Sequence, residues 1–149
     1  VVPTFIFCHS FFEPQTRMIC GILIKNELNQ HELQTFPHAD LVKQALLQAL
    51  CFPLSSPHQS ILFTIVGMLT TQSPWPQAIE AIYKSAQTSV GRNDQTIIHA
   101  IRTLGEVIGG GAEYHNNFLR DVTELLIEKM NDPKIEVRTQ AIDIMSDVI

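Results

Sequence analysis

Residues 131–149 read NDPKIEVRTQAIDIMSDVI, and this stretch decides how the rest of the chain is interpreted. Asp132 is a typical N-cap residue, and Pro133 suits the first helical position, where a missing N–H costs nothing. Apolar residues then recur at spacings of three and four, which places them on one face of a helix. The members of this face are Val137, Ala141, Ile144, Met145 and Val148. The stretch therefore predicts a capped amphipathic helix after a short Asp-Pro break.

Similar breaks recur along the chain near Pro14, Pro57 and Asp94, so that with Pro133 they are spaced by about 40 residues. One further helix fits between each pair of breaks. A helix pair recurring at this interval is typical of HEAT or armadillo repeats, whose pairs are too thin to bury their apolar faces alone and must stack. The predicted fold class is all-α: a right-handed α-solenoid of about 3.5–4 HEAT-type helix pairs. A single helical bundle is the structural alternative.

The predicted domain is one solenoid that covers residues 1–149. Its helix pairs are expected at residues 1–28 (a partial first pair), 39–71, 75–108 and 114–149. Residues 1–12 are ambiguous, because their β-branched and aromatic side chains fit a strand as well as a buried helix. The chain starts with Val1 and stops inside a helical pattern, so we expect it to be a piece of something longer.

Capping and breaking residues predict where helices begin and end. Asp40 is expected to cap a helix that Pro53 ends. Residues 109–111 are three glycines that should end a helix, because glycine accepts the left-handed C-cap conformation. They do not resemble a phosphate-binding loop, since they follow a helix and no Lys-Ser/Thr comes after them. Trp75 lies between two prolines and is expected to pack in the core rather than to serve as an exposed anchor.

Composition argues for a folded protein without a nucleic-acid or membrane site. The 149 residues are 45% hydrophobic and 17% charged, with a formal net charge of −5. No Lys/Arg cluster exists to form a nucleic-acid groove or a polybasic membrane patch. The apolar run at residues 1–12 is too short to span a bilayer. Three scattered cysteines, Cys8, Cys20 and Cys51, argue against disulfides or zinc and for a reducing compartment.

No residue pattern in the chain predicts catalysis, a cofactor or a metal site. The six histidines are dispersed, and none pairs with another His or a Cys at ligand spacing. Cys51 has no nearby His or acid that would mark a nucleophile. Glu124 and Glu128 lie one helical turn apart and fit a solvated face better than acid–base chemistry. We therefore expect a binding protein rather than an enzyme.

Residues 16–28, TRMICGILIKNEL, resemble the second helix of an early repeat in the importin-beta (karyopherin-beta) family of nuclear transport receptors, most closely the transportin type. Gly21, Leu23, Lys25 and Asn26 carry this resemblance. LVKQALLQAL, TIVGMLTT, SPWPQAIEAI, HAIRTLGEVIGG and DPKIEVRTQAIDIM then resemble later helices of the family in the same order. The resemblance covers residues 13–149, and the family's first repeat is absent from this sequence.

This resemblance implies the N-terminal part of a nuclear import receptor. In that family the N-terminal repeats bind the small GTPase Ran in its GTP form through concave second helices, and this binding releases cargo. Such receptors work in the cytoplasm and the nucleus, and they contact nucleoporins and cargo through parts that are not in this chain. The alternative is a generic HEAT/armadillo scaffold or adaptor that mediates protein–protein interaction without Ran.

The resemblance makes a small set of polar residues candidates for partner binding. The set is Lys25, Asn26, His99, Arg102 and Thr103. A structural interpretation competes with it: Lys25 and Asn26 suit a helix C-terminus, and the other three suit a solvated helix face. Arg17 and Arg138 occupy equivalent positions and are expected to be structural, pairing with acidic or carbonyl groups of the neighbouring repeat.

Overall fold

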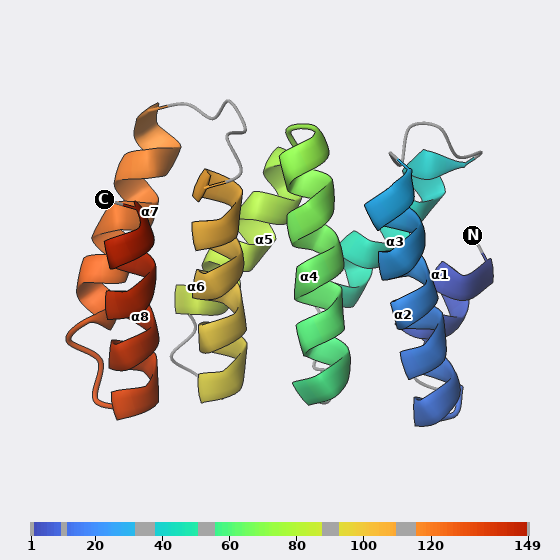
Figure 1. The fold of residues 1–149 in the computed structure, drawn as a ribbon, viewed down its shortest axis with the longest axis horizontal. Coiled ribbons are helices and arrows are strands. Elements are labelled where there is room, and N and C mark those ends of the chain that lie inside the picture. The colour runs from blue at the N-terminus through green and yellow to red at the C-terminus, as the bar shows by residue number, and fades with distance from the viewer. Residues whose placement is uncertain are drawn as a thin grey trace. The chain divides into compact units, whose positions relative to one another are not determined.

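The computed structural model describes residues 2–9, 12–31, 38–50, 56–87, 93–109 and 116–148, and every regular element in these residues is an α-helix (Figure 1). Backbone contacts divide the chain into two compact units, unit 1 (Val1–Leu69) and unit 2 (Thr70–Ile149). The all-α fold class is confirmed. The prediction of a single domain over the whole chain stays a prediction.

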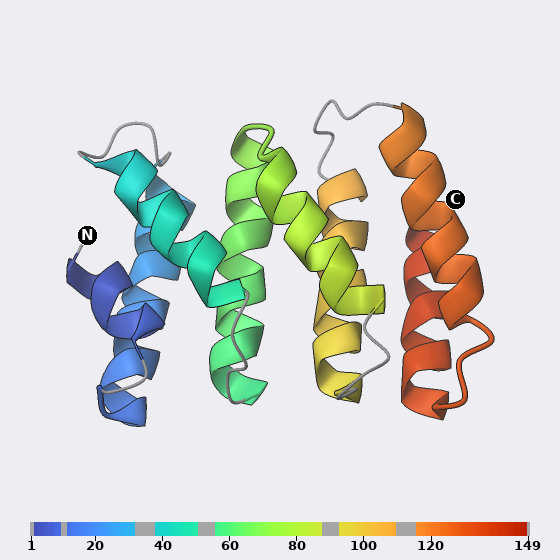
Figure 2. The same cartoon turned by 180° about the vertical axis from the view of Figure 1, so that it is seen from behind.

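Unit 1 contains two helix pairs. Its helices are α1 (Val2–Cys8), α2 (Pro14–Gln30), α3 (Ala39–Leu50) and α4 (Ser56–Gln72), the last of which ends in unit 2. Helix α1 packs on α2 and α3, and Phe7 of α1 is fully buried. The imidazole Nε2 of His58, in the first turn of α4, lies 3.0 Å from the carbonyl oxygen of Pro14 and ties α4 to the start of α2. Within this unit α2 and α4 lie on one side and α1 and α3 on the other (Figures 1 and 2).

Unit 2 repeats this arrangement. Its helices are α5 (Pro76–Gln87), α6 (Asp94–Gly109), α7 (Asn116–Lys129) and α8 (Ile135–Val148). Helix α5 packs on α6, α7 packs on α8, and the two pairs are joined through α6 and α8. The hydroxyl of Tyr83 on α5 also donates a long hydrogen bond, 3.4 Å, to the carbonyl oxygen of Asp121 on α7. Two pairs stacked through their second helices are the arrangement of an α-solenoid.

A glycine brings two second helices close together in each unit. A Cβ atom added to Gly105 of α6 would lie 2.5 Å from Cγ2 of Ile144 on α8. A Cβ atom added to Gly21 of α2 would lie 2.9 Å from Cγ2 of Ile61 on α4, and 2.7 Å from the ring of Phe7. Both inter-helix contacts join residues about 40 positions apart, so the period seen in the sequence is the period of the packing.

Residues 1–12, for which strand and helix were both open, contain a helix, α1. Two predicted caps are wrong. Asp40 lies inside the first turn of α3. The cap is His38, whose backbone φ is 60° and whose carbonyl oxygen accepts hydrogen bonds from the backbone N–H groups of Leu41 and Val42. Asp132 lies three residues before the start of α8; its Oδ1 accepts the Lys134 N–H at 2.9 Å and so orders the turn before the helix. Boundaries of this kind depend on which carbonyl starts the helical ladder, which residue type alone does not decide.

The predicted helix end at the glycines and the predicted burial of Trp75 are confirmed. Helix α6 ends at Gly109, and Trp75 is buried in the turn before α5, where its carbonyl accepts hydrogen bonds from Ala78 and Ile79. Several predicted features lie outside the described residues. They are Pro53, Gly110, Gly111, Cys51 and His115. Among the helices of the described ranges, none is both long and apolar enough to cross a membrane.

Candidate protein-interaction surface

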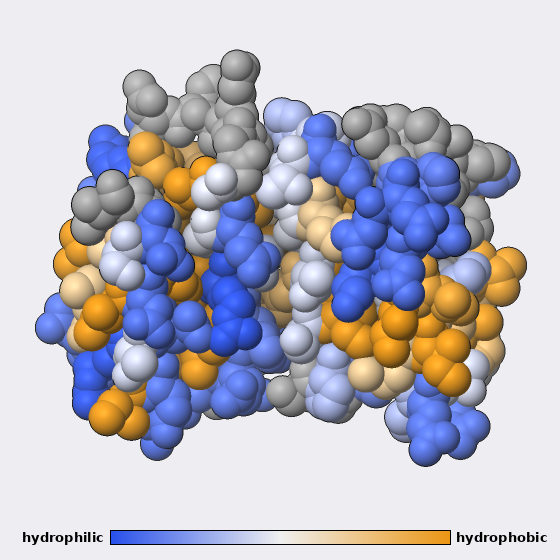
Figure 3. Space-filling view, viewed as in Figure 1, coloured by the Kyte–Doolittle hydropathy of each residue, from blue (hydrophilic) through white to orange (hydrophobic). Residues whose placement is uncertain are grey.

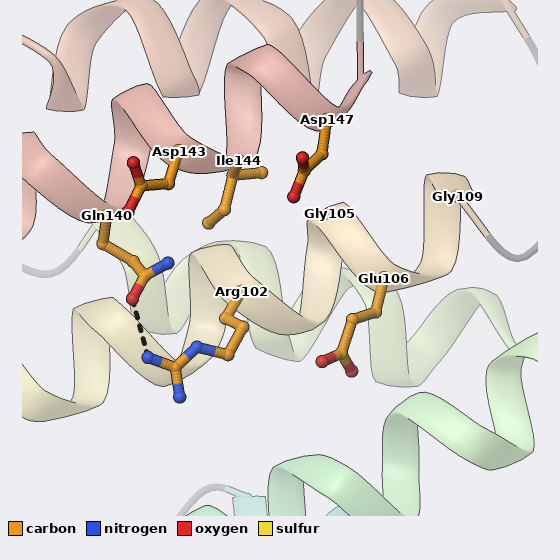
Figure 4. Close-up of a pocket in the computed structure, with 8 residues that line it drawn as sticks. All are labelled: Arg102, Gly105, Glu106, Gly109, Gln140, Asp143, Ile144 and Asp147. Atoms are coloured by element: carbon orange, nitrogen blue, oxygen red, sulfur yellow. Dashed lines mark hydrogen bonds between the residues drawn. The ribbon is translucent and has the colours of Figure 1, made fainter.

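A groove of about 610 Å³ lies between the second helices of unit 2 (Figure 4). Among the residues that the structure describes, its lining comes from α6 and α8. The residues are Arg102, Gly105, Glu106, Gly109, Gln140, Asp143, Ile144 and Asp147. We call this feature the α6/α8 groove.

The helical periodicity of the two sequences builds the α6/α8 groove. On α6 the lining residues recur at spacings of three and four and so share one face. Two of them, Gly105 and Gly109, have no side chain, which leaves room for the groove. On α8 Gln140, Ile144 and Asp147 share the facing side in the same way. Ile144 points at Gly105 and forms the base of the groove, while the polar side chains stand at its edges (Figure 4). The result is an apolar base with a polar rim.

The rim is mainly acidic. It carries three carboxylates, Glu106, Asp143 and Asp147, and one guanidinium, that of Arg102. The guanidinium is held across the groove, because its Nη2 donates to Oε1 of Gln140 at 2.6 Å. Within the residues that the structure describes, no ion pair joins any of the three carboxylates to a base. Unneutralised carboxylates around an open groove favour a basic group on whatever binds there.

Comparison with known families places this groove in a recognised repeat. Residues 97–146 match the HEAT-like repeat family. The chain contains a HEAT-like repeat. The repeat covers most of α6, all of α7 and most of α8, and therefore holds all but one of the groove residues. No curated protein and no solved structure matches the chain.

The HEAT-like repeat bears on function only at a coarse level. Stacked helix pairs present extended surfaces that bind other proteins, so the repeat is typical of an interaction scaffold rather than of an enzyme. In the part of the chain that the structure describes, no three His, Cys, Asp or Glu side chains gather as a metal site would require.

Three of the predicted partner-binding residues lie on the first helix of the HEAT-like repeat, α6. Arg102 is exposed and lines the groove. His99 is half-buried one turn earlier; burial, and then the charge of Arg102, lower the pKa of its imidazole below the usual 6.5. Thr103 is only 3% exposed, and its hydroxyl donates to the carbonyl of His99 at 2.8 Å. Its predicted place on the polar side of the helix was wrong, because a threonine can satisfy its hydroxyl on its own helix and turn its methyl inward.

The other two predicted residues, Lys25 and Asn26, belong to unit 1. Both lie on α2 five and four residues before its end at Gln30, Lys25 half-buried and Asn26 exposed. Neither is the terminal or capping residue of the helix, since α2 continues for another turn and its C-cap is His31. The structure therefore leaves Asn26 open to a partner and removes the helix-end explanation for it.

Arg17 and Arg138 bond carbonyl groups, as the structural interpretation requires, but the carbonyls belong to their own helix pair. Nε of Arg17 donates to the carbonyl of Phe7 at 3.0 Å, and Nη1 of Arg138 donates to the carbonyl of Asp132 at 2.8 Å. Each arginine thus fixes the link between the first and second helix of a pair. Arg17 is itself buried, with 7% of its surface exposed. Burial of the Cys8 thiol raises its pKa to about 11, and the nearby charge of Arg17 partly opposes this rise.

Sequence reasoning missed four of the polar groove residues. They are Glu106, Gln140, Asp143 and Asp147. A signal for them was present, because Arg102 and Glu106 lie four residues apart on the helix, as do Asp143 and Asp147, which places each pair on one side. What the sequence could not show is that α6 and α8 bring these two sides together. Glu124 and Glu128, by contrast, lie on the exposed face of α7 as predicted.

Proposed function

We propose that the chain is the Ran-binding N-terminal part of a nuclear import receptor, in which the second helices bind Ran·GTP and this binding controls cargo release. The coarser function, a protein-interaction scaffold, has the support of the HEAT-like repeat. The step to Ran rests on the resemblance of α2 and its successors to importin-beta-type receptors. In this proposal the protein works in both the cytoplasm and the nucleus.

The observation that carries the proposal is the α6/α8 groove. It lies on the second helices, where the resemblance puts the Ran contact, and its rim holds three carboxylates without ion pairs in the described residues. Ran presents basic surface in the family. An acidic groove of this kind steers a basic partner and adds salt-dependent affinity.

The structure of α2, the helix that carries the resemblance, is compatible with the proposal. Gly21, Lys25 and Asn26, which carry the resemblance, lie in a regular second helix with Gly21 in the close inter-helix contact and Asn26 exposed. The polar residues of the motif are thus available to a partner, while its glycine is explained by packing.

The test is binding of purified Ran loaded with GTP or GDP, measured by pull-down and by titration. We expect binding to the GTP form and little to the GDP form. Replacing both groove aspartates, Asp143→Asn with Asp147→Asn, should weaken binding about tenfold and lower its salt dependence. Glu136→Gln removes a carboxylate from the same helix outside the groove and should leave binding unchanged.

Equal binding of both nucleotide forms would overturn the Ran proposal, and so would a lack of binding to either form. A HEAT/armadillo adaptor without Ran is the competing function. It predicts that the groove variants lose a protein partner whose binding does not depend on the guanine nucleotide.

A further inference from the structure

The two ends of the α6/α8 groove differ in how open they are. At one end Nη2 of Arg102 donates to Oε1 of Gln140 at 2.6 Å, and this bond crosses the groove from α6 to α8. At the other end a Cβ atom added to Gly109 would meet nothing within 4 Å. Between the ends Ile144, which is 7% exposed, packs against Gly105 and forms an apolar base (Figure 4). The groove is therefore a slot that is bridged at the Arg102 end and open at the Gly109 end.

Charge also differs along the groove. Glu106 of α6 follows Arg102 by one turn toward the open end, and Asp147 of α8 lies at that same end (Figure 4). Asp143 stands on the α8 edge, and all three carboxylates are exposed. Among the lining residues that the structure describes, Arg102 is the one cation. A positive group in the groove is therefore attracted to the open end and repelled from the bridged end.

Hydrogen-bond donors gather at the bridged end. The amide oxygen of Gln140 accepts from Arg102, so the amide Nε2 of Gln140 remains a donor without a partner among the described residues. Arg102 carries further N–H groups besides the one that bonds Gln140. These donors suit the backbone carbonyl groups of a polypeptide. In Figure 3 hydrophilic side chains cover much of α6 and α8, and hydrophobic ones show between the two helices. The groove thus offers donors, then an apolar base, then carboxylates.

We propose that the α6/α8 groove binds a single lysine or arginine side chain of a partner protein. The backbone beside that residue lies at the bridged end, the aliphatic stem lies on Ile144, and the cation reaches Glu106 and Asp147. Lysine and arginine share the chemistry that this requires, an apolar stem that ends in a cation. The inference rests on the proposed interaction function of the groove and does not require that the partner be Ran.

The dimensions of the groove favour one extended side chain over other cationic occupants. From Arg102 to Gly109 the groove follows α6 for roughly 10 Å, which is short for a docked helix. Its volume of about 610 Å³ leaves room for the backbone on either side of the bound residue. A bare divalent cation needs several oxygen ligands at one point. In the described part of the chain no three His, Cys, Asp or Glu side chains gather in that way.

The experiment uses lysine, arginine and norleucine as probes, each as its Nα-acetyl methylamide so that both backbone ends are uncharged. Norleucine supplies the aliphatic stem without the cation. In titrations followed by the backbone amide NMR signals of the whole chain, a cationic probe should cause saturable shifts at Gly105, Gly109 and Ile144, with a dissociation constant of about 1–10 mM. Norleucine should cause no saturable shift there. The tighter of the two cationic probes identifies the side chain that the groove prefers.

Two variants separate the steric and the electrostatic contributions. Gly109→Leu should abolish probe binding because it fills the open end, and the fold should tolerate it because the new Cβ meets no atom within 4 Å. Glu106→Gln with Asp147→Asn should weaken probe binding at least about fivefold. Glu124→Gln with Glu128→Gln is the matched control, since it removes two exposed carboxylates from α7, outside the groove, and should leave binding unchanged.

Any of three results would overturn the proposal: no saturable shift at the groove, equal binding of norleucine and the cationic probes, or an equal loss of binding in the two carboxylate pairs. The Ran titration keeps this inference separate from the proposed function. Binding of a cationic probe without any binding of Ran would reject Ran and leave this inference standing. GTP-dependent binding of Ran without binding of any probe would reject this inference and leave Ran standing.

Discussion

Helices α2 and α6 are both second helices of a pair, yet they present opposite chemistry to the outside. Each contains a glycine in close contact with the next second helix, Gly21 against Ile61 and Gly105 against Ile144. Outward, α6 is polar, with Arg102 and Glu106 on the rim of a groove. Outward, α2 is aliphatic, with the side chains of Ile19, Ile22 and Leu23 exposed.

The difference shows that inner packing and outer chemistry are separate properties of such a helix. The packing of one second helix on the next needs a small residue at one position, and this is met in both units. The outer face is free to vary, since the helix is already held by its inner face. Function in this protein is therefore expected to reside in how the outer faces differ from pair to pair.

The two glycines should give the largest difference in stability. In Gly21→Ala the new Cβ meets both the buried ring of Phe7 and Ile61, so we expect the free energy of unfolding to fall by about 2–3 kcal/mol. In Gly105→Ala only one atom, Cγ2 of Ile144, comes closer to the new Cβ than ordinary contact distance, and the other two Ile144 atoms nearby lie at 3.7 Å. The helix propensity of alanine favours both variants by about 1 kcal/mol, so the clash with a single side chain should leave Gly105→Ala with the smaller net loss. Urea unfolding measures both. Adding Ile144→Leu removes the branched methyl group and should restore the stability lost in Gly105→Ala. A loss of stability in Gly105→Ala as large as that in Gly21→Ala would contradict the comparison.

The N-terminal caps of α2 and α6 should give the next largest difference in stability. Asn93 caps α6, since its Oδ1 accepts the backbone N–H groups of Gln95 at 3.0 Å and Thr96 at 3.3 Å. Glu13 at the start of α2 makes no such side-chain bond. Asn93→Ala should cost about 1 kcal/mol of unfolding free energy and Glu13→Ala no more than a few tenths. Thermal unfolding followed by circular dichroism would show this, and equal shifts in melting temperature would speak against it.

Outer-face substitutions should change the free energy of unfolding less than loss of the cap does, but they should separate the two surfaces clearly. Leu23→Ser and Arg102→Ala both alter exposed residues, so each should change the free energy of unfolding by less than about 0.5 kcal/mol. Leu23→Ser should nevertheless reduce the fluorescence of a dye that binds exposed apolar surface, whereas Arg102→Ala should not. Unchanged dye fluorescence in Leu23→Ser would show that the aliphatic face of α2 is not the apolar surface to which the dye binds.

The contribution of α6 to the pH dependence of stability should be the smallest of these effects. Burial and Arg102 lower the pKa of His99 in the folded state below its usual value of 6.5. The unfolded chain therefore binds the proton more readily, so stability is complete above pH 6.5 and declines as the pH falls below it. His99→Gln should flatten this decline and Arg102→Gln should reduce it, as measured by urea midpoints across pH. Helix α2 contains no histidine and should contribute nothing in this range; an unchanged profile in His99→Gln would refute the assignment.

Repeat spacing was enough to predict the all-α fold class, because a helix pair that cannot bury its own apolar face has to stack. It could not predict Asp143 and Asp147 as parts of a groove, because their meeting with Arg102 depends on the contact of α6 with α8. Thr103 shows the limit of residue type, since a polar side chain that bonds its own backbone can be buried. Helix α2 shows the opposite limit: Ile19 and Leu23 recur at helical spacing, as core residues do, and only the packing reveals that both are exposed.

The position of Trp75 has a spectroscopic consequence. It is the single tryptophan of the chain, and it is buried in the turn before α5 of unit 2. The sequence of unit 1 contains no tryptophan and no tyrosine. Intrinsic emission excited in the near ultraviolet therefore reports on unit 2, while unit 1 contributes only phenylalanine. Helical ellipticity reports on both units. A denaturation curve recorded with both signals on one sample will separate if the units unfold independently and coincide if they unfold together.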